Sequence, residues 1–356
     1  MANEYSFAKE FADSFLVGVA LNEEHTNGQD NRINSLVEKH FNASTAENVM
    51  KWEVMQPAEA RFDFRASDKF VSYSKNKGLS ITGHTLVWHQ QTPDWVFVGP
   101  DGKPASRQLL LSRMELHIKT VMGRYKGIIN SWDVVNEALD EDGALRDSKW
   151  RRIIGDDYIA KAFEFATAAD PDAELYYNDY NLFKRTKRNG AVRLIRSLLE
   201  EGIRVKGIGM QAHYALDYPN DVNEIAASIK AFSSLGLAVA ITELDVSVLS
   251  FPEGEEAGAD IGINLSLSEK LNPYSRGLPA NVRKRFEKRY LELFEVFIEN
   301  HEAISRVTFW GVHDGYSWRN NWPMRGRTDY PLVFDRKGKP KPLLKKLIWL
   351  KNKKRR

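Results

Sequence analysis

The strongest constraint on the fold is a regular alternation of short β-rich runs and amphipathic segments along the chain. Eight runs have strand character: residues 15–21, 45–50, 80–89, 128–137, 174–180, 205–214, 237–246 and 306–315. Apolar residues recur between them at helical spacing, as in Leu110, Met114, Ile118, Val121 and Tyr125, and again in Val282, Phe286, Tyr290, Phe294 and Phe297. Strands that alternate with helices indicate a parallel sheet. Eight such units, without a GxGxxG turn after the first, favour a closed (β/α)8 TIM barrel over an open doubly wound sheet.

The length and composition are consistent with one large domain. The chain has 356 residues, of which 42 % are hydrophobic, and it shows no internal repeat and no low-complexity linker. We therefore expect residues 1–350 to form the barrel and the basic ending 351–356 to be a solvated tail. Residues 251–279 lack sustained periodicity, and loops of that length inside compact domains are usually functional or mobile.

The charge pattern limits the partners of the chain. The ending "KNKKRR" contributes five cations to a net charge of only +3, so the body does not resemble a nucleic-acid-binding protein. No apolar run reaches the roughly 18 residues that span a bilayer, so we expect no membrane association. The start "MANEYSFAKEFADSF" lacks a basic segment followed by an apolar one, which predicts a cytoplasmic protein, although a chain whose signal had been removed would read the same. Nothing in the sequence decides whether it forms a homo-oligomer.

Polar residues gather at the carboxyl ends of the predicted strands. They are Glu47, Asn48, His84, Asn136, Glu137, Asn178, Asp179, Gln211, His213, Glu243, Asp245, His313 and Asp314. Any one of them could be an ordinary loop start or helix cap. In a closed barrel, however, these strand ends share one face, so the set predicts a single site.

Two carboxylates in apolar surroundings, Glu137 and Glu243, are candidates for an acid and a nucleophile. Cleavage of a glycosidic bond needs a proton for the departing oxygen and a carboxylate opposite the anomeric carbon. We expect His213 and Gln211 to donate hydrogen bonds to Glu243, and Asp245 to orient His213, so Glu243 is assigned as nucleophile and Glu137 as acid/base. Asn136 is expected to donate a hydrogen bond to the sugar.

Two alternatives for these residues stay open at this point. The carboxylates could belong to a structural network of buried polar groups inside the barrel. A metal site could use His84, His89, His213 and His313, but the chain has no HExxH motif and no cysteine. Phosphate-loop and GxSxG motifs are also absent.

Aromatic and polar residues near the strand ends fit a sugar ligand, because sugar rings offer flat C–H faces to indoles and hydroxyls to planar polar groups. Trp88, Trp310 and Trp318 lie near strand ends, whereas Trp132, Trp150 and Trp349 are expected in the core. A hydrogen-bond acceptor, a group that both accepts and donates, and a donor lie within one turn at Glu47, Asn48 and Lys51, respectively. Solvated loop charges would have the same pattern.

Six blocks, "GHTLVWHQQTPDW", "WDVVNEAL", "YYNDYN", "GIGMQAHY", "ITELDV" and "VTFWGVHDGYSW", resemble in the same order those of glycoside hydrolase family 10, the retaining endo-β-1,4-xylanases, and especially its intracellular bacterial members. The resemblance covers nearly the whole chain. It implies an eight-stranded barrel, no catalytic cofactor and no metal, Glu137 as acid/base and Glu243 as nucleophile. It further implies sugar-binding or supporting roles for Glu47, Asn48, Lys51, His84, Trp88, Asn136, Gln211, His213, Trp310 and Trp318, with Asp245 as the partner of His213.

The expected activity is hydrolysis of internal β-1,4-xylosidic bonds in xylan or xylo-oligosaccharides. The missing signal and the long segment after Glu243 favour a cytoplasmic enzyme that trims imported xylo-oligosaccharides. A retaining β-1,4-glucanase of the same barrel type and a catalytically silent sugar-binding barrel are the alternatives. Trp310 or Trp318 could form the wall that excludes the hydroxymethyl group of glucose.

Overall fold

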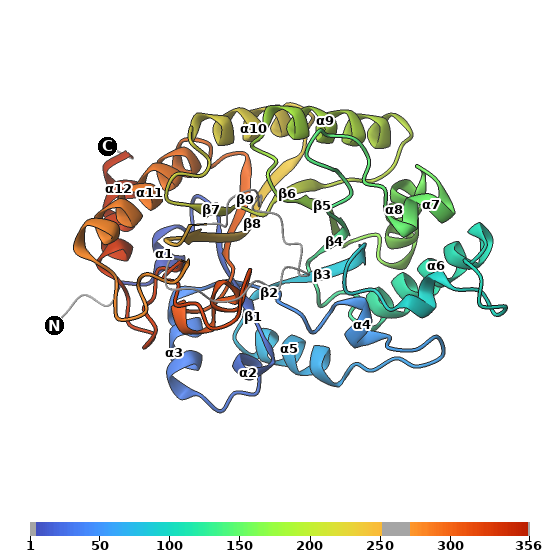
Figure 1. Ribbon diagram of the computed structural model, residues 1–356, viewed down its shortest axis with the longest axis horizontal. Helices are drawn as coiled ribbons and strands as arrows, with labels where there is room; N and C mark the ends of the chain where they lie inside the picture. Colours follow the sequence, from blue (N-terminus) through green and yellow to red (C-terminus); the bar gives the residue numbers. More distant parts are fainter. Residues whose placement is uncertain (1–4, 251–270, 355–356) are drawn as a thin grey trace.

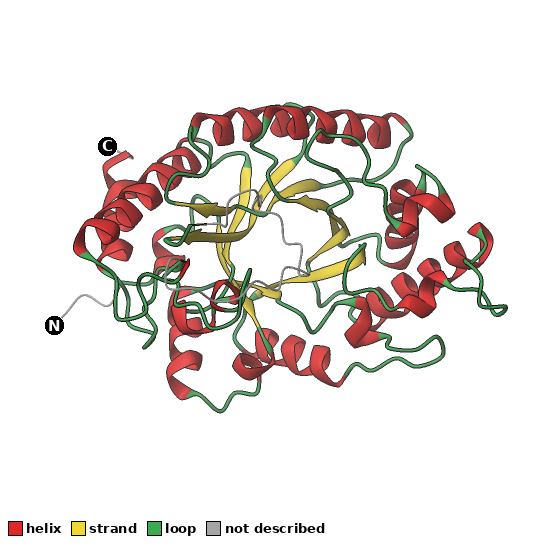
Figure 2. Cartoon of the chain, in the orientation of Figure 1, coloured by secondary structure: helices red, strands yellow, loops and turns green. Residues whose placement is uncertain are grey.

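The computed structural model describes residues 5–250 and 271–354, and its centre is a closed ring of eight parallel strands (Figures 1 and 2). The strands are β1 (Leu16–Leu21), β2 (Ala43–Ala46), β3 (Ser80–Trp88), β4 (Ser131–Asn136), β5 (Glu174–Asp179), β6 (Gly207–Met210), β8 (Ala238–Ser247) and β9 (Ile304–Phe309). Strands β1 to β6 pair in sequence order, β6 pairs with β8, β8 with β9, and β9 closes the ring on β1. The expected (β/α)8 barrel is confirmed.

Three of the predicted strands differ most from the structure in their bounds. Strand β2 ends at Ala46, so Glu47 and Asn48 follow it, and β9 ends at Phe309. The predicted strand 205–214 is divided into β6 and a short strand β7 (His213–Ala215), which pairs with the end of β8. The division occurs because Ala212 has a φ of 65°, which is incompatible with an extended strand.

Helices surround the ring and cover its outer face (Figure 2). The main ones are α3 (Asn31–His40), α5 (Arg65–Asn76), α6 (Arg107–Arg124), α8 (Tyr158–Ala169), α9 (Arg185–Glu200), α10 (Asn223–Ser233), α11 (Ala280–Glu299) and α12 (Pro342–Lys354). Shorter helices are α1 (Phe7–Glu10), α2 (Glu23–Thr26), α4 (Trp52–Met55) and α7 (Lys149–Ile154), with 3-10 turns η1 (Asp94–Phe97), η3 (Asp314–Tyr316) and η4 (Trp318–Asn320).

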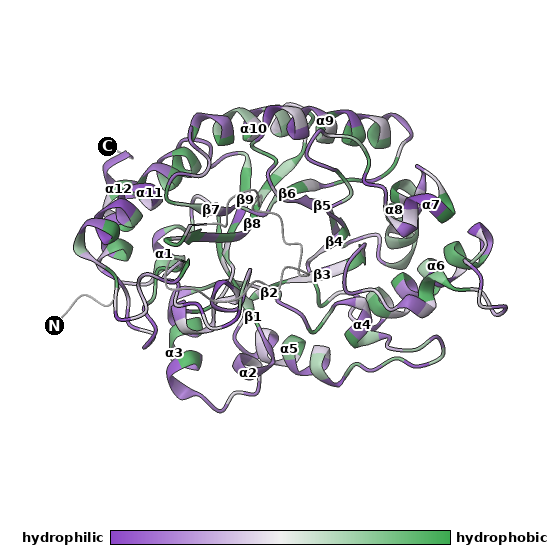
Figure 3. Ribbon diagram, in the orientation of Figure 1, coloured by the Kyte–Doolittle hydropathy of each residue, from purple (hydrophilic) through white to green (hydrophobic). Residues whose placement is uncertain are grey.

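Helix α6 shows why these segments are helical. Its N-cap Ser106 accepts a hydrogen bond from the Leu109 backbone, and Leu110, Met114, Ile118 and Val121 form a fully buried stripe. The apolar stripe predicted in α11 is buried in the same way. Hydrophilic and hydrophobic residues accordingly alternate along α9, α10 and α11 (Figure 3).

The strands present different chemistry to the two sides of the barrel. On the outer side Trp132 packs so closely on β3 that a Cβ at Gly83 would lie 2.2 Å from its ring. Toward the barrel axis, Thr82 and Ser131 share a hydrogen bond of 2.9 Å, and His84 and Asp133 share another of 2.9 Å. The barrel interior therefore contains polar groups already in the first halves of β3 and β4.

The C-terminal segment differs from the expected solvated tail. Helix α12 continues through the predicted boundary at residue 350 to Lys354, and Lys351 is buried, where its ammonium pairs with Asp13 at 2.6 Å. Trp349, which we expected in the core, is 62 % exposed, whereas Trp132 and Trp150 are buried as predicted. The error arises because the apolar stripe of α12 runs through Leu343, Leu344 and Leu347 and leaves Trp349 on the outer side.

None of the helices in residues 5–250 and 271–354 is both long and apolar enough to cross a bilayer. Most of the segment predicted to be a long loop after Glu243, residues 251–270, lies outside the described residues.

Candidate active site

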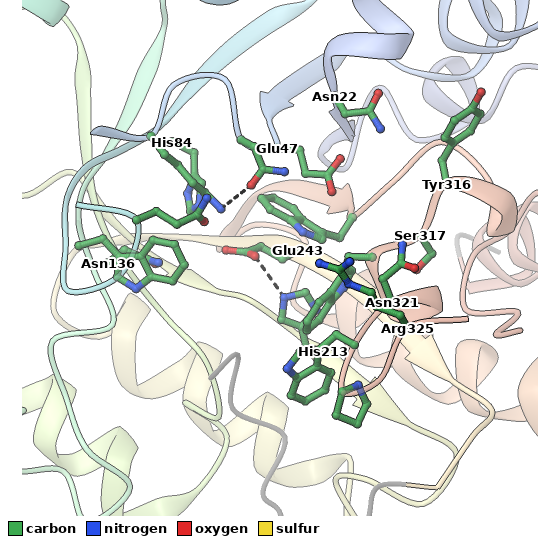
Figure 4. A pocket seen from close by; sticks show the side chains of 18 of the residues that line it. Asn22, Glu47, His84, Asn136, His213, Glu243, Tyr316, Ser317, Asn321 and Arg325 are labelled. Atoms are coloured by element: carbon green, nitrogen blue, oxygen red, sulfur yellow. Dashed lines mark hydrogen bonds and ion pairs between the residues drawn. The ribbon is translucent and has the colours of Figure 1, made fainter. Parts of the chain in front are cut away.

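A cavity of about 1030 Å³ opens at the carboxyl ends of the strands (Figure 4). Eleven of the predicted site residues line it: Glu47, Asn48, Lys51, His84, Trp88, Asn136, Glu137, His213, Glu243, Trp310 and Trp318. Gln211 and Asp245 are buried behind this wall and contact residues that line it. Side chains separated by more than 200 positions thus converge on one site, as the barrel topology predicts.

Strand register aligns the centre of the site. Trp88 of β3 is paired with Asn136 of β4, which is in turn paired with Asn178 of β5. The Asn136 amide lies within 3.0 Å of the Asn178 amide nitrogen and 3.3 Å of the Gln211 amide nitrogen. Asn178 also contacts Glu243 and Gln211 contacts Glu137, so both candidate carboxylates adjoin one row of amides.

Glu243 is a buried carboxylate with a hydrogen-bond donor at each oxygen. His213 Nε2 lies 3.1 Å from Oε2, a contact drawn in Figure 4, and Asn178 Nδ2 donates to Oε1 at 2.8 Å. Burial by itself raises the pKa of Glu243, but the His213 hydrogen bond, the charge of His84 and the Asn178 hydrogen bond outweigh it and hold the pKa below its ordinary value. Glu243 is therefore ionised at neutral pH, as a nucleophile must be.

His213 is held between two carboxylates. Its Nδ1 lies 3.0 Å from Asp245 Oδ2, as expected, and its Nε2 faces Glu243. Burial lowers the pKa of His213, but the charges and hydrogen bonds of Asp245 and Glu243 outweigh this effect and raise the pKa to about 9. A protonated His213 can donate to both carboxylates at once.

Asp245 is anchored by two further donors. Trp318 Nε1 donates to Oδ2 at 2.7 Å, and the fully buried Arg319 pairs with Oδ1 at 2.9 Å. Burial raises the pKa of Asp245, but the charges and hydrogen bonds of Arg319 and His213 outweigh it and keep the pKa below its ordinary value. Because Asp245 cannot rotate away, the orientation of the His213 ring is fixed as well.

Glu137 follows the last residue of β4 and lies in the left-handed backbone region, with φ 57°. Trp88 Nε1 donates to its Oε2 and Gln211 Nε2 to its Oε1, each at 2.8 Å. The expectation that the Gln211 amide donates to Glu243 is wrong, because this amide donates to Glu137 instead. The backbone of Gln211 still contacts Glu243, since its carbonyl accepts from the Glu243 N–H at 2.8 Å.

Glu47, Asn48 and Lys51 lie together on the cavity wall, as the sequence predicted. Lys51 Nζ donates to Asn48 Oδ1 at 3.0 Å and lies 4.8 Å from the centre of the Trp88 ring. Burial raises the pKa of Glu47 to about 7, although Lys51 and Asn22 partly oppose the shift. Burial also lowers the pKa of Lys51, against the attraction of the surrounding carboxylates.

Aromatic rings complete the wall. Trp310 meets His84 edge-on at 5.5 Å between ring centres, and Trp318 stacks on Trp322 at 4.9 Å. His84 is in turn fixed by Asp133. Flat indole faces beside amides and carboxylates form a surface suited to a sugar chain.

Several residues of the site were not selected from the sequence. Asn178 was among the polar strand-end residues but was given no role of its own, although its register partner Asn136 was. Others were missed because their segments carry no periodic signal: Asn22, Trp322 and Arg325 in loops, Tyr316 in the 3-10 turn η3, and Arg319, which contacts Asp245, in the 3-10 turn η4.

The arrangement combines an ionised buried carboxylate, a second buried carboxylate and an aromatic wall. This combination suits nucleophilic and acid/base chemistry at an acetal carbon. The described part of the chain contains no cluster of three or more His, Asp or Glu side chains that could hold a metal ion.

Comparisons of the sequence and of the structure with known proteins all indicate the same family. The sequence model of glycosyl hydrolase family 10 matches residues 6–349. The chain is 44 % identical to endo-1,4-beta-xylanase A of Xylanibacter ruminicola, over 94 % of this chain and 90 % of that protein. It is 41 % identical to endo-1,4-beta-xylanase of Geobacillus stearothermophilus, over 96 % of this chain and 98 % of that protein. A solved endoxylanase from a sugarcane soil metagenome superimposes with a TM-score of 0.93 at 39 % identity, covering 97 % of this chain and all of that one.

Proposed function

Because the chain belongs to glycosyl hydrolase family 10, we propose that it is an endo-1,4-β-xylanase that hydrolyses internal β-1,4-xylosidic bonds with retention of configuration. The observation that carries the proposal is Glu243, a carboxylate held ionised by His213 and Asn178 in the same cavity as Glu137. The curated relatives named above are xylanases, which supports xylose as the sugar.

The reaction proceeds by double displacement. Glu243 attacks the anomeric carbon and forms a covalent xylosyl ester while Glu137 gives its proton to the departing oxygen. Glu137 then removes a proton from water, which attacks the same carbon and releases Glu243. Each displacement inverts the configuration, so the product keeps the β configuration. Only side chains of this site and water take part in these steps.

The decisive experiment replaces the nucleophile. Glu243→Ala should lose at least about 10⁴-fold in kcat. Azide should restore turnover of an activated aryl β-xylobioside, because the small anion can occupy the space of the lost carboxylate. The product of this single displacement should be the α-xylobiosyl azide, whereas ¹H NMR of the unmodified enzyme should show β-product first.

The controls separate the alternatives. Glu115→Ala, a half-buried position on α6 whose carboxylate pairs with Lys119, should leave activity intact. A β-azide from Glu243→Ala, or an α-product from the unmodified enzyme, would contradict the assignment. No turnover of any β-1,4 substrate would indicate a silent sugar-binding barrel.

A β-1,4-glucanase is the other enzymatic candidate. Xylose lacks the hydroxymethyl arm of glucose, and we propose that Trp310, which lines the cavity beside His84 and His213, excludes that arm. We expect kcat/KM for an aryl β-xylobioside to exceed that for the aryl β-cellobioside. Equal or reversed rates would favour the glucanase.

The proposal extends to short chains as substrates in the cytoplasm. A cavity of about 1030 Å³ is large enough for an oligosaccharide, which supports short chains as substrates. Xylotriose to xylohexaose should therefore be cleaved with a higher kcat/KM than polymeric xylan. Much faster cleavage of the polymer would overturn this extension and leave the xylanase activity in place.

A further inference from the structure

The backbone that carries Glu137 is fixed both by the barrel and by side chains. The Glu137 N–H donates to the Asn178 carbonyl of β5 at 2.8 Å, and side chains fix the turn that follows. Beyond Asn136 the chain leaves β4, and Glu137 takes a left-handed φ of 57°, which non-glycine residues adopt rarely. Arg146 Nε donates to the Glu137 carbonyl at 3.0 Å, and Arg146 Nη2 donates to the Leu139 carbonyl at 3.1 Å. One planar guanidinium thus bridges both ends of this turn.

The N–H groups of the same turn are also fixed. The Ala138 N–H donates to Tyr177 Oη at 3.2 Å, and the Leu139 N–H donates to Asp179 Oδ2 at 3.3 Å. Asp179 is itself paired with Lys187 at 2.9 Å, and both side chains are completely buried. These N–H contacts come from β5, whereas Arg146 belongs to the loop that follows the turn.

Arg146 is fixed in its own position. Its Nη2 donates to Tyr180 Oη at 2.9 Å, its Nη1 lies 3.2 Å from Asp140 Oδ1, and its backbone N–H donates to the Ala138 carbonyl at 2.8 Å. Arg146 does not line the cavity, nor do Tyr177 and Asp179. Arg146 hydrogen-bonds Glu137 at its backbone carbonyl, and its charge also attracts the Glu137 carboxylate.

We propose that Arg146 is a positioning residue for proton transfer, because its guanidinium holds the left-handed turn that directs the Glu137 carboxyl at the leaving-group oxygen. The inference rests on the proposed glycosidase function. It predicts that loss of Arg146 weakens only those reactions that need the proton from Glu137. Displacements of about 1 Å in a catalytic group can cost on the order of 100-fold in rate.

The test compares two leaving groups. The kcat/KM of a retaining glycosidase reports the first displacement. In that step xylotetraose needs a proton on its departing oxygen, whereas 2,4-dinitrophenyl β-xylobioside does not. We expect Arg146→Ala to lower kcat/KM about 10- to 100-fold for xylotetraose and less than about threefold for the dinitrophenyl substrate. Glu137→Ala should show the same pattern with a larger loss for xylotetraose.

Matched variants define the contribution of the guanidinium. Arg152→Ala removes a neighbouring exposed arginine, whose guanidinium pairs with Asp147, and should leave both rates unchanged. Arg146→Lys should recover only part of the rate, because one ammonium cannot reproduce the planar fork across two carbonyls. Added guanidinium should partly restore xylotetraose hydrolysis by Arg146→Ala.

Each outcome bears on the inference. Equal losses on both substrates, or no loss on either, would overturn it. If Arg146→Ala does not fold, the same comparison is made with Arg146→Lys and with Tyr180→Phe, which removes one hydrogen bond from the guanidinium. Failure of the proposed function itself is distinguishable, because the unmodified protein would then not hydrolyse the dinitrophenyl substrate.

Discussion

At the scale of single residues, Asn178 shows how a neutral side chain sets the charge state of the site. The Thr242 hydroxyl donates to Asn178 Oδ1 at 2.7 Å, so the amide nitrogen is directed at Glu243 Oε1. Residue 209 must be glycine to leave room for Asn178, because a Cβ at Gly209 would lie 2.2 Å from Asn178 Oδ1. The strand pairing, the Thr242 hydroxyl and the absence of a side chain at Gly209 together fix the hydrogen bond from Asn178 to Glu243.

We expect Asn178→Ala to move the acidic limb of kcat/KM to higher pH. The hydrogen bond from Asn178 stabilises the ionised form of Glu243, so its loss raises the pKa of this carboxyl. Glu243 must be ionised to attack, and activity should therefore fall at a higher pH than in the unmodified enzyme. A pH profile of kcat/KM checks this.

Asn352→Ala, an exposed change on α12, provides the control and should leave the profile unchanged. An acidic limb that stays in place, or moves to lower pH, in Asn178→Ala would show that this hydrogen bond does not govern the charge of Glu243.

Residue types at strand ends could be predicted from the sequence, but their partners could not. Asp245 lies two residues after Glu243 and therefore points to the same side of the strand. Its contact with His213, the residue opposite it on β7, follows from this simple alternation. Gln211 lies in the same predicted strand as His213, but its amide contacts Glu137, and the strand is interrupted at Ala212 between the two residues. A single positive φ at an alanine has no signature in the sequence.

At the scale of elements, the loop after β4 is packed against α9 through two glycines. A Cβ at Gly190 would lie 2.2 Å from the Gly143 carbonyl oxygen and 2.6 Å from its Cα. The same loop leads from Glu137 to Arg146. Helix α9 therefore supports the turn that carries the proposed acid, and only a residue without a side chain allows this contact.

Two glycine-to-alanine changes in helices should consequently have opposite effects. Gly123→Ala in α6 meets no atom within 4 Å and should stabilise the protein by about 0.5–1 kcal/mol, the usual gain of alanine over glycine in a helix. Gly190→Ala should cost about 1–3 kcal/mol through overpacking and reduce kcat/KM for xylotetraose, because the loop must move. Denaturant unfolding and the kinetic assay together check this prediction.

An equal gain in stability from Gly123→Ala and Gly190→Ala would show that the loop after β4 can shift to accept the new methyl group without loss of stability. Normal kinetics in a destabilised Gly190→Ala protein would show that α9 does not support the turn at Glu137.

At the scale of the whole molecule, the barrel could be predicted because each of its units shows a local pattern. Strands and helices are visible as changes of periodicity, and closure follows from having eight units of one kind. The end of the chain was predicted less well because a cationic sequence suggests solvation, whereas the stem of Lys351 is buried against α1 and its charge reaches Asp13. Burial of a lysine depends on tertiary contacts that composition does not contain.

The stability of the molecule should fall between pH 6.5 and about 9. The pKa of His213 is raised from 6.5 to about 9 in the folded protein, so protonation of His213 favours the folded state. This contribution is complete below pH 6.5 and is lost as the pH rises through 9, and its size is on the order of 3 kcal/mol. The free energy of unfolding from denaturant titrations at pH 6 and pH 9 measures the loss.

His213→Asn should show a smaller decrease over the same interval, because other groups, including the buried Lys51, titrate equally in both proteins. NMR of the imidazole nitrogens supplies an independent check, since His213 should titrate near pH 9. Titration near 6.5, or an equal decrease in both proteins, would show that the two carboxylates do not hold the proton on His213.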